Sequence, residues 1–335
     1  MIGRCIDTRP GSSSKRGMSD ASTPVCWVVT DGRRGIENQA LGLAEAVQRQ
    51  MRASGGDLAI GKAVAHKDGT IALPDTGQPA LWIGCGRLAV PLARPHSKVF
   101  PNCFFVYVQD PRRRWKDFDL ILAPTHDRMK KSNGVSMIGS PNRIDRARLE
   151  EDAAGFTDRL NALPGPRAAV LIGGPSKRFR MDAKTGAYLE ERLEQLAGLD
   201  LSLMITVSRR TPDAVRERLK ARFSGRDRVW FHDGEGENPY FAFLAAADWV
   251  FVTEESTNML VEAASAGKPV YALPLSGSPG KFARLHAELE AHGAMRPWLG
   301  RLERWSYPRL AETERAAAEL IARWKPEFPG AGPSA

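Results

Sequence analysis

The segment from Asp248 to Leu275 reads DWVFVTEESTNMLVEAASAGKPVYALPL and decides the fold. Residues 249–252 form a short run of β-branched and aromatic residues, which is typical of a strand buried on both faces. Ser256 is a good N-cap for a helix, because apolar residues recur at helical spacing after it and Gly267 then ends the pattern. A second apolar run, which predicts another strand, covers residues 270–273. The order strand, helix, strand predicts a βαβ unit, which is the building block of a parallel sheet.

A ligand site is expected where the first of these strands ends and the helix begins. In open parallel sheets, ligands lie at the carboxyl ends of the strands, close to helix N-termini. Ser256 marks the helix start, and Glu262 falls on the same side of the helix as Asn258 and Ser265, away from the apolar stripe. Glu262 is therefore a candidate ligand-binding residue, although a solvated helix glutamate gives the same pattern.

The length and composition of the chain favour a soluble globular protein of two domains. It has 335 residues, of which 42% are hydrophobic and 26% are charged. The net charge of +9 predicts acidic partners, which are nucleoside diphosphates, an anionic membrane surface or nucleic acid. Nucleic acid ranks last, because the sequence contains no nucleic-acid-binding motif.

The sequence also bears on the cellular compartment. No apolar run has the length of a membrane span, and the four cysteines are scattered as reduced thiols would be. Residues 1–24 are rich in Ser, Gly, Arg and Pro, and we expect them to form a disordered tail. These features favour a cytoplasmic protein, with peripheral contact at the inner face of the membrane as a further expectation.

Outside the central unit, the chain divides into two α/β halves at the hinge Pro164-Gly165-Pro166. Apolar strands separated by helices run through residues 25–163 and, after the hinge, through residues 166–305. The strands expected in the first half cover residues 25–29, 58–64, 80–84, 103–108, 119–122 and 135–138, and a helix over about 145–163 closes it. Each half is predicted to be a Rossmann-like domain, and the two domains are expected to face a central cleft.

A glycine-bearing turn follows the first strand of the chain. Asp31, Gly32 and Gly35 come directly after the strand at 25–29 and before a helix. Strand, turn and helix in this order make a candidate cradle for a phosphate or an acceptor. The Gly-x-x-Gly pair is neither the dinucleotide fingerprint nor a Walker loop, so it does not identify the ligand.

The second half places glycines and cations after two successive strands. Gly174, Ser176 and Lys177 follow the first of them, where backbone N–H groups can hold a diphosphate. Arg209 and Arg210 follow the next strand, and arginine side chains match phosphate oxygens. A tight turn with a solvated lysine and a solvated pair of arginines give the same patterns.

Candidate catalytic residues come from the first half. His126 lies at a predicted strand end and has an ordinary pKa suited to a general base, which makes it a candidate together with its neighbour Asp127 and with Asp31. A structural histidine and a helix-capping aspartate are the alternatives. Late in the chain, Lys281 and Arg284 share a helix face, which is also the pattern of a basic surface helix.

Several motifs occur together in this chain. They are the opening WVVTDGRRG-x-ENQ from Trp27, Gln109-Asp110-Pro111, His126-Asp127, Leu171 to Pro175, Ser208 to Pro212 and the unit from Thr253 to Val270. This combination resembles the mitochondrial-fission "elongated mitochondria" family, in a bacterial-type form, and covers nearly everything from Val25 to Trp324. The family tends to carry Asp-Ser where this chain has Glu255-Ser256.

The resemblance extends to the GT-B glycosyltransferases, whose nucleotide-sugar signature is similar to Ser-x5-Glu-Ala-x3-Gly-x-Pro-Val from Ser256. It implies that Glu262 accepts hydrogen bonds from ribose hydroxyls and that the helix N-terminus at Ser256 faces the diphosphate. It also implies that Lys281 and Arg284 contact the donor sugar. A last helix within residues 306–325 would cross back to the first domain, as in GT-B proteins.

Three functions follow as alternatives. The first is metal-independent transfer of a sugar from a nucleoside-diphosphate donor to an acceptor, lipid-linked or glycan, with no further cofactor. The second is epimerisation or hydrolysis of a nucleotide sugar on the same fold. The third is a non-catalytic adaptor that uses a GT-B shell. The sequence contains no Asp-x-Asp and no His/Cys cluster with the spacing of metal ligands.

Overall fold

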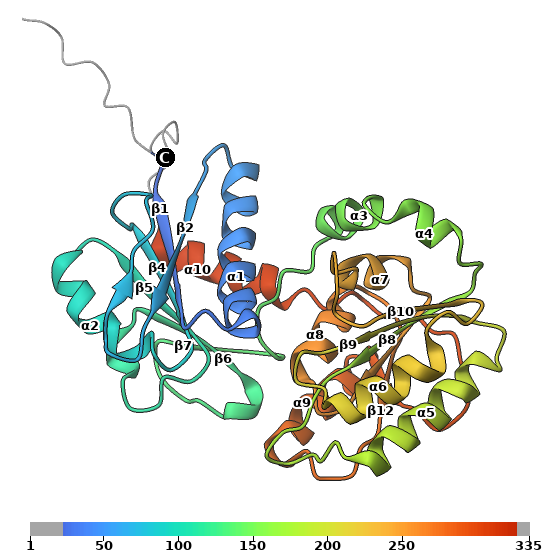
Figure 1. Cartoon of the computed structure of the whole chain (residues 1–335). Coiled ribbons are helices and arrows are strands. Elements are labelled where there is room, and N and C mark those ends of the chain that lie inside the picture. The colour runs from blue at the N-terminus through green and yellow to red at the C-terminus, as the bar shows by residue number, and fades with distance from the viewer. Residues whose placement is uncertain (1–22, 327–335) are drawn as a thin grey trace, which may run out of the picture.

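The computed structural model describes residues 23–326, so the tail expected over residues 1–24 lies almost entirely outside the described residues. The chain forms two domains, each built on its own mainly parallel sheet with helices on both faces (Figure 1). The strands of the two sheets do not join, which confirms the predicted α/β architecture.

The first sheet has seven strands, of which only β3 is antiparallel to its neighbour. In spatial order they are β3 (Ile71–Ala72), β2 (Ala59–Ala65), β1 (Val25–Thr30), β4 (Leu81–Cys85), β5 (Phe104–Val108), β6 (Leu120–Pro124) and β7 (Gly134–Met137). The helical elements are α1 (Arg34–Ala53), α2 (Val90–Val99) and the short turns η1 (Trp115–Asp117) and η2 (Thr125–Asp127). The sequence did not predict β3, which is only two residues long.

Helix α1 forms because its apolar residues recur on one face. Ala40, Leu43 and Val47 are fully buried and pack with Val28 of β1 in one core cluster. Helix α2 covers the opposite face of this sheet, where the cluster of Trp27, Trp82 and Phe105 lies.

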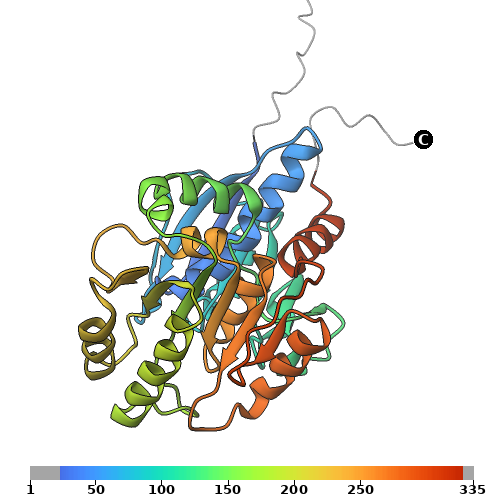
Figure 2. The same cartoon turned by 90° about the vertical axis from the view of Figure 1, so that its right-hand side faces the viewer.

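The last helix, α10 (Glu312–Trp324), returns to the first domain. Its Ala316, Ala317 and Leu320 are fully buried in the same cluster as α1. Figure 1 and Figure 2 show α10 beside α1, although more than two hundred residues of chain separate them. The predicted return of the C-terminal helix is therefore present.

The second sheet has six parallel strands. In spatial order they are β10 (Val229–His232), β9 (Ser202–Val207), β8 (Arg167–Ile172), β11 (Trp249–Thr253), β12 (Val270–Leu273) and β13 (Met295–Pro297). Helices α5 (Ala183–Ala197) and α6 (Asp213–Phe223) cover one face. The other face carries α7 (Tyr240–Ala246), α8 (Thr257–Ser265) and α9 (Ala283–Ala291), and α9 follows the turn η3 (Gly280–Phe282).

The predicted βαβ unit is β11, α8 and β12. The two strands pair in parallel, with Val250 opposite Val270, and both are completely buried. Ser256 occupies the N-cap position of α8, but its side chain makes no capping hydrogen bond. This leaves the first N–H groups of α8 without that internal partner.

The helix expected over residues 145–163 differs from the prediction in two ways. It is broken into α3 (Arg146–Ala154) and α4 (Thr157–Asn161), and the break falls at Gly155, a poor helix former. Leu149 and Leu160 pack in the core of the second domain and not of the first. The first domain therefore ends near β7, because this segment buries its apolar side chains beside α7.

Candidate functional site

The loop after β8 lies at the carboxyl end of the second sheet and packs closely on its neighbours. A Cβ atom on Gly173 would collide with Oε1 of Glu255, and a Cβ atom on Gly174 would lie 2.5 Å from Cβ of Arg210. The Gly173 N–H donates to Oγ1 of Thr253 at 2.9 Å, which fixes the loop against the end of β11. A side chain at either position would require neighbouring atoms to shift. Because glycine has none, the loop after β8 can pack closely against the loops after β9 and β11.

Three cations follow the carboxyl ends of β8 and β9. Lys177, Arg209 and Arg210 are exposed, and none of them forms an ion pair within residues 23–326. Arg210 lies directly against Gly174. The carboxyl ends of β8 and β9 thus carry positive charge that the described part of the chain does not neutralise.

Ser176, which we expected to contact a diphosphate, is used within its own turn. Its hydroxyl accepts the N–H groups of Arg178 at 3.2 Å and of Phe179 at 3.1 Å. This turn carries the Arg178 guanidinium onto Gly280, where a Cβ atom would collide with it. Arg178 is a further cation in the loop after β8, and nothing in the sequence separates it from ordinary surface arginines.

Glu255 is a buried acid at the start of α8. Its side chain lies against Gly173, the residue is only 8% exposed, and neither carboxyl oxygen has a hydrogen-bond partner in the described chain. Burial raises the pKa of Glu255 to about 7, against the opposing effects of the Thr253 hydroxyl, nearby N–H groups and the Arg210 charge. The sequence contains no signal that Glu255 is buried.

Glu262 is held by a neighbouring helix. Oε2 of Glu262 accepts a hydrogen bond from the hydroxyl of Tyr240, at the start of α7. Burial raises the pKa of Glu262 to about 7, and the Tyr240 hydrogen bond acts in the opposite direction. A freely solvated helix glutamate, the alternative left open by the sequence, is wrong for this residue.

The side of α8 that carries Asn258 and Ser265 contacts the first domain. Oδ1 of Asn258 accepts the side-chain amide of Gln39 at 3.3 Å, and Oε1 of Gln39 accepts the amide of Gln109 at 2.8 Å. The side-chain amide of Asn142 donates a hydrogen bond to Oγ of Ser265 at 3.0 Å. Gln39 and Gln109 lie within the motifs that resemble the family, but the sequence did not indicate that they join the domains.

The start of α1 faces the same boundary. A Cβ atom on Gly35 would lie 3.6 Å from the Asn258 amide, and Gly32 has a φ of +73° that favours glycine.

Asp31, a proposed base, is paired with Arg33 at 2.6 Å. Burial opposes ionisation of Asp31, but the hydrogen bonds and charge of Arg33 outweigh it and lower its pKa. Asp31 is therefore ionised and paired at neutral pH.

His126 and Asp127 lie where the two domains touch. The Asp127 carboxylate is paired with Lys281 of the second domain, and the His126 ring packs edge-on against Phe282 with centroids 5.0 Å apart. Burial lowers the pKa of His126 to about 4, with Asp127 raising it and Lys281 lowering it. Lys281 is thus used between domains, and Arg284 on the same helix is exposed.

Residues 23–326 contain no group of three His, Cys, Asp or Glu side chains placed to hold a metal ion. None of their helices combines the length and apolar character needed to cross a bilayer. Cys26, Cys85 and Cys103 are buried free thiols.

These observations define a class of protein. Two parallel α/β domains meet at the carboxyl ends of their sheets, and a C-terminal helix returns to the first domain, which is a GT-B-like architecture. A family model described as "Mitochondrial fission ELM1" matches residues 34–324. The chain belongs to this ELM1 family.

Two sequence relatives match most of the chain. Mitochondrial fission protein ELM1 of Arabidopsis thaliana is 29% identical over 314 residues, which cover 84% of this chain and 71% of the plant protein. An uncharacterized protein of Rickettsia prowazekii is 24% identical over 347 residues, which cover 88% of this chain and 97% of that protein.

Solved structures share the fold at low identity. UDP-GlcNAc 2-epimerase of Methanocaldococcus jannaschii has a TM-score of 0.56 and 10% identity, covering 90% of this chain and 100% of that one. The same epimerase in complex with UDP-GlcNAc and UDP has a TM-score of 0.54 and 11% identity, covering 90% and 99%. These likenesses show the fold.

Proposed function

We propose that this chain is a metal-independent glycosyltransferase that uses a nucleoside-diphosphate sugar. One observation carries the proposal: the Gly173-Gly174 loop packs against both Arg210 and the start of α8, with unpaired cations around it. Backbone N–H groups, a helix N-terminus and arginines at strand carboxyl ends are the groups that bind a diphosphate in this kind of sheet.

Each part of the donor has a candidate partner. Gly174, Lys177, Arg209 and Arg210 would hold the diphosphate, with the start of α8 at Ser256. Oε1 of Glu262 remains free to accept a ribose hydroxyl, since Tyr240 engages only Oε2. The structures of related fold contain UDP-GlcNAc and UDP, which makes uridine nucleotides the first donors to test.

The reaction would move the sugar across the domain boundary. The bond between the anomeric carbon and the diphosphate oxygen breaks, and a bond to an acceptor oxygen forms. The nucleoside diphosphate leaves with the extra negative charge, which the cations and the α8 N-terminus stabilise. The acceptor proton would pass to a base of the first domain. We propose His126 for this role, because it is neutral at pH 7, whereas Asp31 is paired with Arg33.

Epimerisation or hydrolysis of the same donor is the second candidate. Glu255 supports it, because a carboxyl group with a pKa of about 7 beside the donor site can give or take a proton at neutral pH. The adaptor function remains as the outcome in which no nucleotide binds.

The test begins with binding. Thermal unfolding is followed with UDP, GDP, UDP-GlcNAc and related sugars, because a ligand that binds the native state raises the melting temperature. The Arg210→Gln variant is compared with Arg146→Gln, an exposed arginine on α3 of the same domain. We expect the stabilisation to be reduced only in Arg210→Gln.

The products then separate the functions. UDP released only when an acceptor is added supports transfer, whereas free sugar or a changed sugar without acceptor supports hydrolysis or epimerisation. Absence of any nucleotide binding contradicts both enzymatic functions and favours the adaptor.

A further inference from the structure

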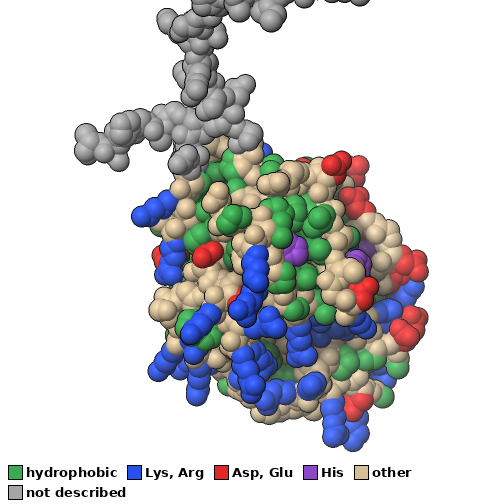
Figure 3. All heavy atoms as spheres, turned by 90° about the vertical axis from the view of Figure 1, so that its left-hand side faces the viewer, with side chains coloured by type: hydrophobic (Ala, Val, Ile, Leu, Met, Phe, Trp, Pro, Cys, Tyr) green, Lys and Arg blue, Asp and Glu red, His purple; other side chains and the backbone are tan. Residues whose placement is uncertain are grey.

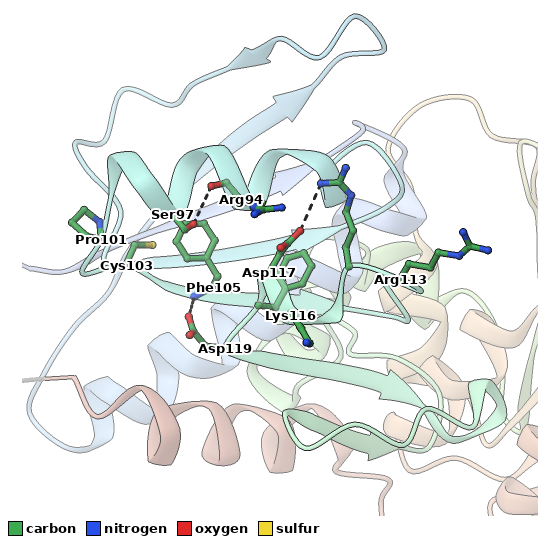
Figure 4. Close-up of a pocket in the computed structure, with 11 residues that line it drawn as sticks. Arg94, Ser97, Pro101, Cys103, Phe105, Arg113, Lys116, Asp117 and Asp119 are labelled. Carbon is green, nitrogen blue, oxygen red and sulfur yellow. Dashed lines mark hydrogen bonds and ion pairs between the residues drawn. The ribbon is translucent and has the colours of Figure 1, made fainter.

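A cavity lies in the first domain, apart from the nucleotide site proposed above. It has a volume of about 720 Å³ and lies on the α2 face of the first sheet, between α2 and the segment that contains η1 (Figure 4). Its lining shares no residue with the site at the carboxyl ends of the second sheet. It is therefore a separate feature, and an occupant of it need not be the donor.

The floor of this cavity is apolar. It consists of Cys103 and Phe105 at the start of β5, Phe118 before β6, and Pro101 at one end. Phe105 and Phe118 belong to the core of the first domain, so the floor is a fixed surface. Phe105 and Phe118 are only 2% and 5% exposed, so the apolar body of a ligand would contact their exposed edges together with the exposed Pro101.

The walls of the cavity are cationic. Arg94 comes from α2, and Arg113, Arg114 and Lys116 come from the segment around η1. In Figure 4 the side chains of Arg94 and Lys116 lie on different sides of Asp117, and the side chain of Arg113 extends away from them at one end. Two acids also line the cavity, which leaves four cations against two anions.

Both acids already have partners. Asp117 is paired with Arg114 at 3.6 Å, and Asp119 accepts the backbone N–H of Phe105 at 2.7 Å. In contrast, Arg94, Arg113 and Lys116 form no ion pair within the described chain. These three cations have no ion-pair partner, and Asp119 bonds to a backbone N–H and not to a cation, so the lining as a whole carries a net charge of +2.

More cations lie on the same face of the molecule. Figure 3, which shows this side, has Lys and Arg side chains gathered over its lower half. Arg112, Lys130 and Lys131 are exposed and lie outside the lining. Lys116 and Lys131 both lie over the ring of Trp115, at 5.4 and 5.0 Å from its centroid. This field favours approach of an anion.

We propose that this cavity binds a phosphate group attached to an apolar body. Arginine and lysine bind phosphate oxygens through charge-assisted hydrogen bonds, and the aromatic floor takes the apolar part. A soluble aryl or acyl phosphate and a phospholipid headgroup share this chemistry. The proposal does not depend on the function of the nucleotide site.

The test uses the full chain and two matched triple variants. The cavity variant is Arg94→Gln with Arg113→Gln and Lys116→Gln. The control variant is Arg112→Gln with Lys130→Gln and Lys131→Gln, which removes the same charge from the same face but outside the lining. Calorimetric titration measures binding of inorganic phosphate and of phenyl phosphate to each protein, at low and at raised salt.

We expect phenyl phosphate to bind wild type more tightly than inorganic phosphate, because only the former uses the floor. The cavity variant is expected to lose roughly tenfold or more in affinity for phenyl phosphate, whereas the control variant changes by about twofold or less. Equal loss in the two variants would show general attraction by the basic face and overturn the proposal. So would failure of wild type to bind phenyl phosphate.

A competition experiment identifies the source of the phosphate. Vesicles of phosphatidylcholine alone, or mixed equally with phosphatidic acid, are added to the complex with phenyl phosphate. Displacement by the mixed vesicles alone assigns the cavity to a lipid headgroup. Binding of phenyl phosphate that neither vesicle displaces assigns it to a soluble phosphate ester.

Discussion

The hydroxyl of Tyr240 donates a hydrogen bond to Oε2 of Glu262, and this contact joins the start of α7 to the middle of α8. It orients the carboxyl group and leaves Oε1 as the oxygen able to accept from a ligand. The Tyr240 phenol is itself buried, and burial raises its pKa well above the ordinary value, so it remains a donor at neutral pH.

At pH 8, above the Glu262 pKa of about 7, Glu262→Gln is expected to weaken nucleotide binding roughly tenfold to a hundredfold, because a charge-assisted hydrogen bond to the ribose is lost. The amide oxygen can still accept from Tyr240, so the melting temperature without ligand is expected to change little. Titration of wild type and variant with UDP and GDP measures the effect. Glu217→Gln, an exposed glutamate on α6, is the matched control. Unchanged affinity in Glu262→Gln would exclude the ribose contact.

The affinity for a nucleotide sugar is expected to fall as the pH rises through about 7. Glu255 lies against Gly173 with no partner on either oxygen, and its pKa is about 7. The protonated carboxyl can donate to a phosphate oxygen, whereas the ionised form repels it. Calorimetric titration with UDP-GlcNAc over this pH range measures the affinity. This ligand is chosen because it has no terminal phosphate that would itself change protonation near pH 7.

Glu255→Gln supplies the comparison for this prediction. The amide can donate at every pH, so the variant is expected to bind with little pH dependence. Glu262 also titrates near pH 7, so the readout is the ratio of the wild-type affinity to that of Glu255→Gln. A ratio that stays constant across neutral pH would show that Glu255 does not face the diphosphate.

The same residue predicts a pH dependence of folding without ligand. The pKa of Glu255 rises from 4.5 to about 7 on folding, so the folded state binds the proton more tightly. The stabilisation that comes from holding this proton is complete below pH 4.5, the pKa of Glu255 in the unfolded chain, and is lost as the pH rises through about 7, its pKa in the folded chain. The free energy of unfolding is expected to fall by about 3 kcal/mol over this range. Urea unfolding is measured near pH 5 and near pH 8. The free energy of unfolding of Glu255→Gln is expected to rise relative to that of wild type at the higher pH. An equal difference at the two values would contradict the burial of an unpaired carboxyl group.

Gly174→Ala is expected to reduce nucleotide binding, because the new Cβ would lie 2.5 Å from Cβ of Arg210 and must displace one of the two loops. Gly186→Ala is the matched control: its Cβ meets nothing closer than 3.4 Å, and alanine is favoured by roughly 0.5–1 kcal/mol within α5. Binding is measured by titration and folding by thermal unfolding. Equal nucleotide affinity in the two variants would separate the glycine loop from the ligand site.

His126 is expected to remain neutral down to about pH 4, because its ring is buried beside Phe282 and near Lys281. NMR titration of the histidine rings, with His126→Asn to assign the signal, measures this directly. A titration midpoint near 6.5 would show that the His126 ring is exposed to water, and would contradict its burial between the two domains.

The local elements and their order followed from the sequence. Buried strands such as residues 249–252 are continuous apolar runs, and α1 and α8 have apolar stripes of helical period, so both signals are readable along the chain. The glycine loops and arginines after the strands could also be placed at the carboxyl ends, because parallel strands share that edge. The family resemblance rested on these same segments.

The tertiary structure decided which side chains remain available. Lys281 is taken up by Asp127 of the other domain, Ser176 by its own turn, and one oxygen of Glu262 by Tyr240. The partners of Lys281 and Glu262 lie 154 and 22 residues away along the chain. Periodicity reports only local spacing, so it cannot reveal such pairs.

Packing also decided which segment belongs to which domain and which acids lose their water. Residues 145–163 join the second domain because their leucines fit beside α7, and Glu255 is buried because two glycines let a loop close over it. The sequence determined that the chain is a two-domain α/β protein with cations at the strand ends. Only the fold determined that a carboxyl group with a raised pKa lies among them, since desolvation is a property of surroundings brought together from distant parts of the chain.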